Sequence, residues 1–363
     1  MPRTVVVAMS GGVDSSVAAW VLKQQGYNVI GATMQIWPEN AAEGDAGEGS
    51  GCCGLSAAGD ARRVADMIGI PHYVLNFREI FQRDVIDYFT REYLSGRTPN
   101  PCIACNRLVK WGALLRKARE LGADCIATGH YARLSKYPET GRLTLARAKT
   151  LEKDQTYALY PLTQPQLRAT LLPVGDYTKD EVRSLARELG LAVADKRESQ
   201  EICFVSEAGY GKFIEQTSGG AGAEGFFLDE SGKVIGRHRG VAHYTIGQRK
   251  GLGAFGRPMY VKKISAADNA ITLADRDENL FSRGLTARDV VFMGAAELKT
   301  PAEALAKIRY SHAPARCLAW VDVTGVLRVE FEQPQRAVTP GQAIVIYRNE
   351  CIICGGEIVR AVD

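Results

Sequence analysis

Residues 10–16 read Ser-Gly-Gly-Val-Asp-Ser-Ser, directly after an apolar run and at the start of a helical pattern. The glycines permit a sharp turn and a close backbone approach to a ligand, and the serines add hydroxyl donors. Because free N–H groups and the dipole at a helix start attract anions, the pattern predicts a phosphate-binding loop. It has neither the lysine of a Walker loop nor the dinucleotide fingerprint. Asp14 adds a negative charge there, which favours a bridging Mg²⁺ ion.

A second candidate site contains Cys102 and Cys105, in the segment Pro-Asn-Pro-Cys-Ile-Ala-Cys-Asn-Arg. Its prolines and polar residues predict a loop rather than a core. If a helix starts at Asn106, its dipole and Arg107 favour the thiolate of Cys105, which is then a candidate nucleophile. A further thiol, Cys203, lies far along the chain in Glu-Ser-Gln-Glu-Ile-Cys-Phe.

The other cysteines are interpreted differently. The chain has nine cysteines, and an odd number argues against a complete disulfide framework. Apolar surroundings predict that Cys125 and Cys317 are packing residues. The roles of Cys52, Cys53, Cys351 and Cys354 stay open; the last two have Cys-x-x-Cys spacing, but the two isoleucines between them and their strand context favour packing.

The loop sequence is similar to the signature of the PP-loop ATP pyrophosphatases, which transfer AMP to a carbonyl or carboxyl oxygen. With further motifs, nearly the whole chain resembles the bacterial tRNA-specific 2-thiouridylases, which replace the C2 oxygen of the wobble uridine with sulfur. These motifs occupy residues 100–106, 128–133, 153–155, 198–203, 243–253 and 307–310.

The resemblance implies roles for individual residues. ATP contacts are implied at Ala8, Met9, Ser10, Gly11, Gly12, Val13, Asp14, Ser15, Met34 and Gly129. Contacts to the target base are implied at Asn100, Pro101 and Cys102, and contacts to tRNA at His130, Lys153, Asp154, Gln155, Arg309, Tyr310 and Gln342. Splayed RNA bases stack on aromatic or arginine planes, a role that also suits Tyr244 and Arg249 in residue type.

The resemblance further implies the chemistry and the partners. Transfer of AMP to the C2 oxygen creates a good leaving group, and an enzyme persulfide then supplies sulfur. We expect Cys203 to carry the persulfide, Cys105 to act at the base, and a Cys105–Cys203 disulfide to form on product release. The expected partners are a tRNA of the Lys, Glu or Gln type with a wobble uridine, and a cysteine desulfurase or sulfur-relay protein.

Alternatives remain open. Some family members have Asp, a proposed base, where this chain has Cys102. Three thiols, Cys102, Cys105 and Cys203, are also compatible with a [4Fe-4S] cluster whose open iron carries sulfide, or more weakly with zinc. Two other functions remain possible from the sequence. One is a PP-loop ligase that forms a C–N bond and needs no paired thiols, and the other is a non-catalytic RNA-binding protein.

The elements that position these residues alternate in the first half of the chain. Apolar runs predict strands at residues 5–9, 28–34, 72–77 and 124–128, with helical patterns at 14–25 and 64–68. This alternation predicts a parallel sheet. Residues 39–51, rich in Gly, Ala and acidic residues, are predicted to form a mobile loop over the sheet edge.

Glycine-rich short strands are predicted after residue 205, with a hairpin at 225–236 and strands at 315–323, 326–331, 343–347 and 357–361, which suggests a small β-barrel or sandwich. The predicted class is α/β. With the resemblance, this implies an adenine-nucleotide alpha-hydrolase-like (PP-loop) parallel sheet domain at residues 1–205, a small central tRNA-binding module at 206–280, and a C-terminal β-barrel at 281–363.

Composition agrees with an ordinary folded protein of two to three domains, since 46% of the 363 residues are hydrophobic and 24% charged. A signal-peptide core and long apolar segments are lacking, so we expect a cytoplasmic protein without membrane contacts. The net charge is only +4, yet residues 231–263 contain no acidic residue and eight cations: Lys233, Arg237, Arg239, Arg249, Lys250, Arg257, Lys262 and Lys263. With interleaved aromatic residues, this stretch indicates a polyanion-binding surface.

Overall fold

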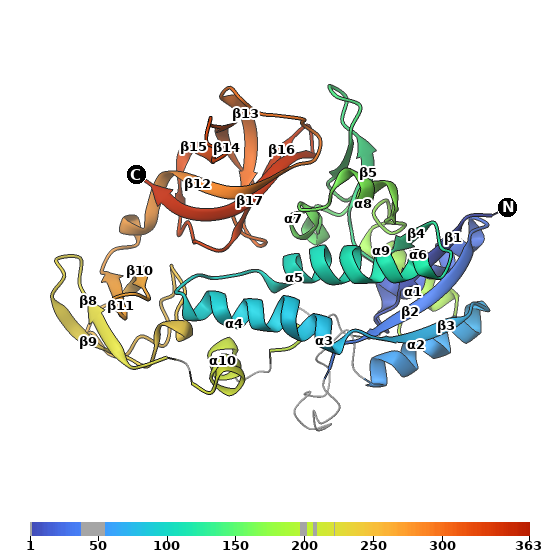
Figure 1. Cartoon of the computed structure of the whole chain (residues 1–363), viewed down its shortest axis with the longest axis horizontal. Helices are drawn as coiled ribbons and strands as arrows, with labels where there is room; N and C mark the ends of the chain where they lie inside the picture. The colour runs from blue at the N-terminus through green and yellow to red at the C-terminus, as the bar shows by residue number, and fades with distance from the viewer. Residues whose placement is uncertain (1, 38–54, 197–201, 206–208, 221) are drawn as a thin grey trace.

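A computed structural model describes residues 2–37, 55–196, 202–205, 209–220 and 222–363 (Figure 1). The chain forms an N-terminal α/β domain, a small central β module and a C-terminal β-barrel, so the predicted fold class is confirmed. The loop predicted at residues 39–51 lies outside the described residues, as do Cys52 and Cys53.

The N-terminal domain is built on a five-stranded parallel sheet in the order β3-β2-β1-β4-β7. Its strands are β1 (Thr4–Ala8), β2 (Asn28–Gln35), β3 (His72–Asn76), β4 (Cys125–Ala127) and β7 (Thr170–Leu171). The first four match the predicted strands closely. Val5, Val6 and Val7 are at most 1% exposed, because helices cover both faces of the central strand β1.

Helices α1 (Val13–Gln24) and α2 (Leu55–Ile68) pack beside the sheet, and α9 (Lys179–Glu188), from much later in the chain, packs against α1. Two long helices lie side by side. One comprises α3 (Arg78–Phe81), the π-helical η1 (Gln82–Ile86) and α4 (Asp87–Leu94). The other comprises α5 (Pro101–Ala104), the π-helical η2 (Cys105–Leu114) and α6 (Leu115–Glu120). Shorter helices are η3 (Leu151–Lys153), α7 (Thr156–Leu159), α8 (Gln164–Arg168) and α10 (Tyr210–Ser218).

The central module contains a four-stranded sheet in the order β10-β11-β8-β9. Its elements are β8 (Gly225–Leu228), β9 (Val234–His238), η4 (Val241–His243), β10 (Tyr260–Ser265), β11 (Ala270–Ala274) and η5 (Asp277–Leu280). The predicted hairpin is confirmed: its turn is held by the Asp229 carboxylate, which accepts bonds from the amides of Ser231 and Lys233 at 2.9 and 3.0 Å. Strands β10 and β11 were not predicted.

The C-terminal barrel consists of β12 (Phe281–Phe292), β13 (Ala302–Lys307), β14 (Ala315–Val321), β15 (Leu327–Arg336), β16 (Ala343–Arg348) and β17 (Cys351–Val362). It closes because β12 pairs with both β15 and β17. Strand β17 is longer than predicted, because Gly355 and Gly356 interrupt its apolar pattern. A Cβ on Gly355 would lie 2.5 Å from the Tyr160 ring, so close packing explains the glycine there.

A hairpin of the N-terminal domain joins the barrel sheet. Strands β5 (Arg133–Lys136) and β6 (Leu143–Ala146) pair with each other, and Ala146 pairs with Cys351 of β17. The Thr144 hydroxyl also donates to the Ile352 carbonyl at 2.6 Å. The first and last domains are therefore connected by backbone pairing as well as by side-chain contacts.

Four cysteines are buried in the structure. Cys125 and Cys317, which were assigned to packing, are 0% and 6% exposed, which confirms their burial, and Cys351 and Cys354, whose roles the sequence left open, are 6% and 0% exposed. Burial raises the pKa of Cys317 and of Cys354 to about 12, so both thiols stay protonated at neutral pH. No helix in the described ranges combines the length and the apolar character needed to cross a bilayer.

Candidate active site

The predicted phosphate loop is the turn between β1 and α1. Gly11 has φ +67°, and a Cβ there would lie 2.3 Å from the Ala57 carbonyl of α2, so glycine is required. The Ser15 and Ser16 hydroxyls both donate to the Gly12 carbonyl, at 3.1 and 2.9 Å. Gly12, the N-cap of α1, provides no side-chain cap, so the first amides of the helix remain suited to an anion.

The charge of Asp14 has a protein partner. Lys179, at the start of α9, donates to both Asp14 carboxylate oxygens at 2.7 and 2.9 Å, and the Tyr131 hydroxyl donates to one of them at 2.7 Å. A lysine 165 positions away thus neutralises the Asp14 carboxylate in this structure, and the Mg²⁺ ion expected there stays a prediction. Only the fold brings the two residues together.

A second lysine that the sequence reasoning missed also reaches the loop. Lys196 donates to the Gly11 carbonyl at 3.2 Å and to the Asp60 carboxylate at 2.7 Å. For Lys179 a signal was available: Thr178 and Glu181 form a capping box, which marks the start of α9 and puts Lys179 in its first turn. The loop therefore lies beside two cations, as a polyphosphate site requires.

The loop lies at the point where the strand order of the sheet reverses, between β1 and its neighbour β4. Ligands of open parallel sheets bind at such a point, beyond the carboxyl ends of the strands. Gly129 follows β4, and a Cβ there would lie 2.6 Å from the Ser15 amide nitrogen. The structure thus brings Gly129 against the start of α1, while the predicted contact residues Ala8, Met9 and Met34 are buried at the ends of β1 and β2.

Substitution of Gly129 with alanine tests this close contact. The added methyl group must push the segment after β4 away from α1, so we expect ATP affinity to fall about tenfold or more and stability to fall by about 2 kcal/mol. ATP titration and thermal unfolding measure the two effects. Gly220→Ala is the matched control, since a Cβ there meets nothing within 4 Å. Equal affinity in wild type and Gly129→Ala would contradict the assignment of Gly129 to the nucleotide site.

The cysteine pair lies on a helix that begins earlier than expected. Asn100 is the N-cap, and its side chain accepts bonds from the amides of Cys102 and Ile103 at 3.1 and 3.3 Å, with Pro101 as the first helical residue. The expected start at Asn106 is wrong, because Asn followed by Pro was itself the start signal. Cys102 is exposed in the first turn, and Cys105 is partly buried one turn later. The helix dipole therefore acts more strongly on Cys102.

Cys203 lies in a turn anchored by its neighbour Phe204. The Phe204 ring packs against Phe81, Phe89 and Phe213, with centroid distances of 5.7, 5.3 and 5.1 Å. Cys105 and Cys203 both pack, partly buried, against the hydrophobic core of the N-terminal domain. Residues 198–201 of the Cys203 motif lie outside the described residues.

The iron–sulfur and zinc alternatives do not fit this arrangement. Within the part of the chain that the structure describes, which includes Cys102, Cys105 and Cys203, no three His, Cys, Asp or Glu side chains are placed to hold a metal ion. The expected three-thiol ligand set is therefore not assembled. Cys102 is exposed, and Cys105 and Cys203 are partly buried.

Several predicted RNA-contact residues have other partners. Asp154 is 4% exposed, and its carboxylate accepts bonds from the Ala148 amide at 3.1 Å and the Thr156 hydroxyl at 2.7 Å. Arg309 donates from one guanidinium nitrogen to the carbonyls of Ile246 and Ala337, both at 3.0 Å. Both side chains thus support the fold where direct RNA contacts were expected.

The aromatic candidates differ in exposure. Tyr310 is 45% exposed, and the Lys307 ammonium lies 5.4 Å from its ring centre. Tyr244 is 4% exposed in the core of the central module, where it packs edge-on against Phe227. The prediction that Tyr244 stacks on a base is therefore wrong, because the Tyr244 ring is buried in the core of the central module and cannot reach RNA.

His130 is a neutral residue beside the nucleotide loop. Its Nδ1 lies 2.7 Å from the Thr128 hydroxyl, and its ring lies 5.7 Å from that of Trp111. Burial lowers the pKa of His130 well below its ordinary value, with nearby Lys110 acting in the same direction. At neutral pH His130 can therefore contribute hydrogen bonds but no charge.

The barrel holds the segment that leads into the cysteine helix. Gln342 donates to the Thr98 carbonyl at 2.8 Å, and the Thr98 amide donates to the Pro340 carbonyl at 2.9 Å. Arg97 also forms an ion pair with Glu357 of β17. The predicted RNA-contact residue Gln342 thus fixes the backbone two residues before Asn100.

All eight cations of the basic stretch 231–263 are exposed. Lys262 pairs with Glu230 at 2.6 Å and Arg257 with Asp275 at 2.9 Å, so acidic residues outside the stretch compensate part of its charge. Arg249 and Lys250 follow the turn after β9 and η4 at the surface of the central module.

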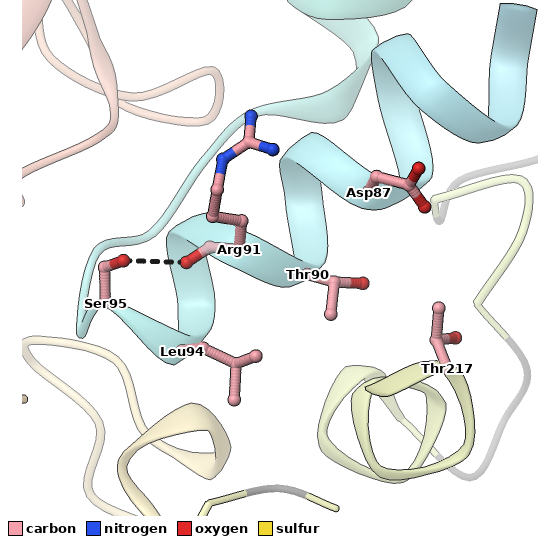
Figure 2. A pocket seen from close by; sticks show the side chains of 6 residues that line it. All are labelled: Asp87, Thr90, Arg91, Leu94, Ser95 and Thr217. Atoms are coloured by element: carbon pink, nitrogen blue, oxygen red, sulfur yellow. Dashed lines mark hydrogen bonds between the residues drawn. The ribbon is translucent and has the colours of Figure 1, made fainter. Parts of the chain in front are cut away.

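A separate open pocket of about 320 Å³ lies between α4 and α10 (Figure 2). Asp87, Thr90, Arg91, Leu94, Ser95 and Thr217 line it. Its side chains belong to none of the predicted contact sets, and the Ser95 hydroxyl is bonded to the Arg91 carbonyl at 2.8 Å. The pocket is therefore distinct from the nucleotide loop.

Comparison with known proteins agrees with this geometry. Three family models match: a tRNA methyl transferase HUP domain at residues 3–207, a tRNA methyl transferase PRC-barrel domain at 211–275, and an aminomethyltransferase beta-barrel domain at 282–358. A solved 4-thiouridine synthetase–RNA complex with bound ATP aligns over 59% of this chain and 50% of that chain, with a TM-score of 0.35 and 14% identity.

Curated relatives match over almost their full length. The tRNA-specific 2-thiouridylase MnmA of Acetivibrio thermocellus is 53% identical over 98% of this chain and 99% of its own. The corresponding protein of Lachnoclostridium phytofermentans is 52% identical over 99% and 100%. Since such identity extends through all three domains, the chain belongs to the MnmA family of tRNA-specific 2-thiouridylases.

Proposed function

We propose that this protein is a sulfurtransferase that uses ATP to replace the C2 oxygen of the wobble uridine in tRNA with sulfur. The observation that carries the proposal is that one domain holds the phosphate loop with its two lysines and also both motif thiols, Cys105 and Cys203, on its core. A ligase that forms a C–N bond needs no such thiols, and a non-catalytic RNA-binding protein needs no phosphate loop.

ATP would bind at the turn between β1 and α1. The first amides of α1 and the ammonium groups of Lys179 and Lys196 would face its phosphates. Mg²⁺ enters the proposal as the counter-ion that ATP brings, rather than as a partner of Asp14. Transfer of AMP to the uridine C2 oxygen, with release of pyrophosphate, then converts a poor leaving group into a good one.

Sulfur transfer would use the two motif thiols. The terminal sulfur of a Cys203 persulfide attacks C2, and AMP leaves. The Cys105 thiolate then attacks the Cys203 sulfur, which releases 2-thiouridine and forms a Cys105–Cys203 disulfide. An external thiol reduces that disulfide, and a cysteine desulfurase or relay protein of the cytoplasm renews the persulfide. This route needs no cluster, because only the two thiols Cys105 and Cys203 carry sulfur.

The tRNA would contact all three domains. Near the base, we assign Asn100, Pro101 and Cys102 at the start of the cysteine helix. His130, Lys153 and Gln155 would meet the RNA beside the nucleotide loop, and Tyr310 and Gln342 would do so from the barrel. The domain limits proposed from the sequence, 1–205, 206–280 and 281–363, put the basic stretch in the central module.

Mass spectrometry of nucleosides tests the proposal directly. Unmodified tRNA with a wobble uridine is incubated with the protein, ATP, Mg²⁺, a cysteine desulfurase, cysteine and a reductant. We expect 2-thiouridine to appear and AMP and pyrophosphate to be released in equal amounts. Release of AMP without any thiolated nucleoside would favour the ligase, and absence of AMP would favour the RNA-binding protein.

The basic stretch yields a separate prediction. Replacing Arg249 and Lys250 with alanine should weaken tRNA binding and reduce the salt slope, d log K/d log[salt], by about 1.5, as expected for two lost phosphate contacts. Filter binding at several salt concentrations measures the slope. Lys299→Ala removes a barrel cation that is paired with Glu297 and serves as the control. A slope identical to that of wild type would assign both residues to the fold.

A further inference from the structure

Tyr131 connects two parts of the site that the sequence keeps apart. Its hydroxyl donates to the Asp14 carboxylate of the phosphate loop at 2.7 Å. Its backbone amide donates to the Gln155 side chain at 2.9 Å, and its carbonyl accepts from the Gln155 amide at 2.9 Å. One residue, 3% exposed, is thus bonded at one end to the phosphate loop and at the other to the segment assigned to tRNA contact.

The phosphate-loop end of this connection is tightly defined. Asp14 is held by the Tyr131 hydroxyl and the Lys179 ammonium, and that ammonium also lies 5.6 Å from the Tyr131 ring centre. A hydrogen bond to a charged acceptor is stronger than one between neutral groups. Gly129, two residues before Tyr131, packs directly on the start of α1. A displacement of Tyr131 would therefore move both the Asp14 carboxylate and the backbone around the first turn of α1.

The tRNA end is equally constrained. Asp154 anchors the 153–155 segment through the Ala148 amide and the Thr156 hydroxyl, and that hydroxyl lies 3.1 Å from the Tyr347 hydroxyl of the barrel. Lys153 and Gln155 remain partly exposed on either side of this buried anchor. A ligand on this segment would therefore act on Tyr131 through the paired Gln155 bonds rather than by shifting the whole segment.

We propose that Tyr131 is a positioning residue through which tRNA bound at Lys153 and Gln155 orients Asp14 and Lys179 for ATP. The inference rests on the proposed function and adds to it a physical connection between its two substrates. Reciprocal coupling follows: if tRNA tightens ATP binding, ATP tightens tRNA binding by the same factor.

The test measures coupling rather than activity. The affinity for an ATP analogue with a methylene bridge between the α- and β-phosphates is determined with and without saturating unmodified tRNA. We expect the wild-type affinity to rise about fivefold or more with tRNA. In Tyr131→Phe, which keeps the ring and loses the hydroxyl, this ratio should fall to within about twofold of one, because a charge-assisted bond is lost. Gln155→Ala should also reduce the ratio, because it removes the side-chain bond between the tRNA-contact segment and the Tyr131 amide.

Controls separate positioning from structural support. Tyr137→Phe makes the same change at a hydroxyl bonded to Glu139 in the β5–β6 hairpin, and should keep the wild-type ratio. If Tyr131 were only structural, Tyr131→Phe would lower the melting temperature and weaken the analogue equally with and without tRNA; that unchanged ratio would overturn the inference. A wild-type ratio of one would also overturn it while leaving the proposed function intact. Wild-type protein that binds no analogue or no tRNA would overturn the proposed function.

Discussion

Replacing Cys105 or Cys203 with serine should reduce 2-thiouridine formation by about a thousandfold or more, because each substitution removes a thiol that must form or break a sulfur–sulfur bond. ATP binding should persist, since the phosphate loop lies on other elements of the domain. Mass spectrometry of nucleosides measures the first quantity and ATP titration the second. The Cys203→Ser protein should also lack the persulfide, which mass spectrometry of the intact protein detects as one added sulfur in wild type.

Cys102 distinguishes the two sulfur-transfer routes. With a persulfide route, Cys102→Ser should cost no more than about tenfold, because only two thiols carry sulfur. If a three-thiol cluster carried the sulfur, Cys102→Ser should lose activity as completely as Cys105→Ser. Wild-type protein purified without oxygen should then contain iron. Cys317→Ala, a change in the barrel core, is the control for loss of a thiol as such. Full activity in Cys105→Ser would reject both routes.

Lys179→Met should lower kcat/KM for ATP by about 30- to 100-fold. The substitution leaves the Asp14 carboxylate without its cation next to the ATP phosphates, and an uncompensated, partly buried charge costs several kcal/mol. The Asp14 side chain is 29% exposed, so solvent screening reduces this cost to about 2–3 kcal/mol. Pyrophosphate release at varied ATP concentrations measures the effect.

A double substitution identifies the cause. If the unpaired carboxylate is responsible, Asp14→Asn introduced together with Lys179→Met should restore about tenfold of the loss, since no charge then remains unpaired. Additive losses would show instead that Lys179 acts on ATP independently of Asp14. Lys149→Met is a suitable control, because this exposed lysine pairs with Glu181, which lies in helix α9 together with Lys179.

Much of this site was accessible from residue types and spacing. The strand, turn and helix around the Ser-Gly-Gly-Val-Asp-Ser loop were predicted correctly because glycines and flanking periodicity are local features. Burial of Cys125 and Cys317 also followed from their neighbours along the chain. Errors arose where a local signal was overlooked, as at Asn100 and Pro101, whose cap and proline begin the cysteine helix.

Contacts between distant segments were beyond such reasoning. Three contacts join residues that no periodicity relates. Lys179 pairs with Asp14, Tyr131 bonds to both Asp14 and Gln155, and Gln342 donates to the Thr98 carbonyl. The β5–β6 hairpin joined the barrel for the same reason, since strand pairing across domains depends on how the domains dock.

From the linear chain alone come the anion loop, the parallel α/β domain, the closed β domain and the identity of the thiols, because each depends on local periodicity, turns or side-chain chemistry. Folding in three dimensions decided which charge neutralises Asp14, which aromatic ring is exposed and whether three thiols converge. Those outcomes depend on packing between elements far apart in sequence, where small differences in position determine whether a hydrogen bond or an ion pair forms.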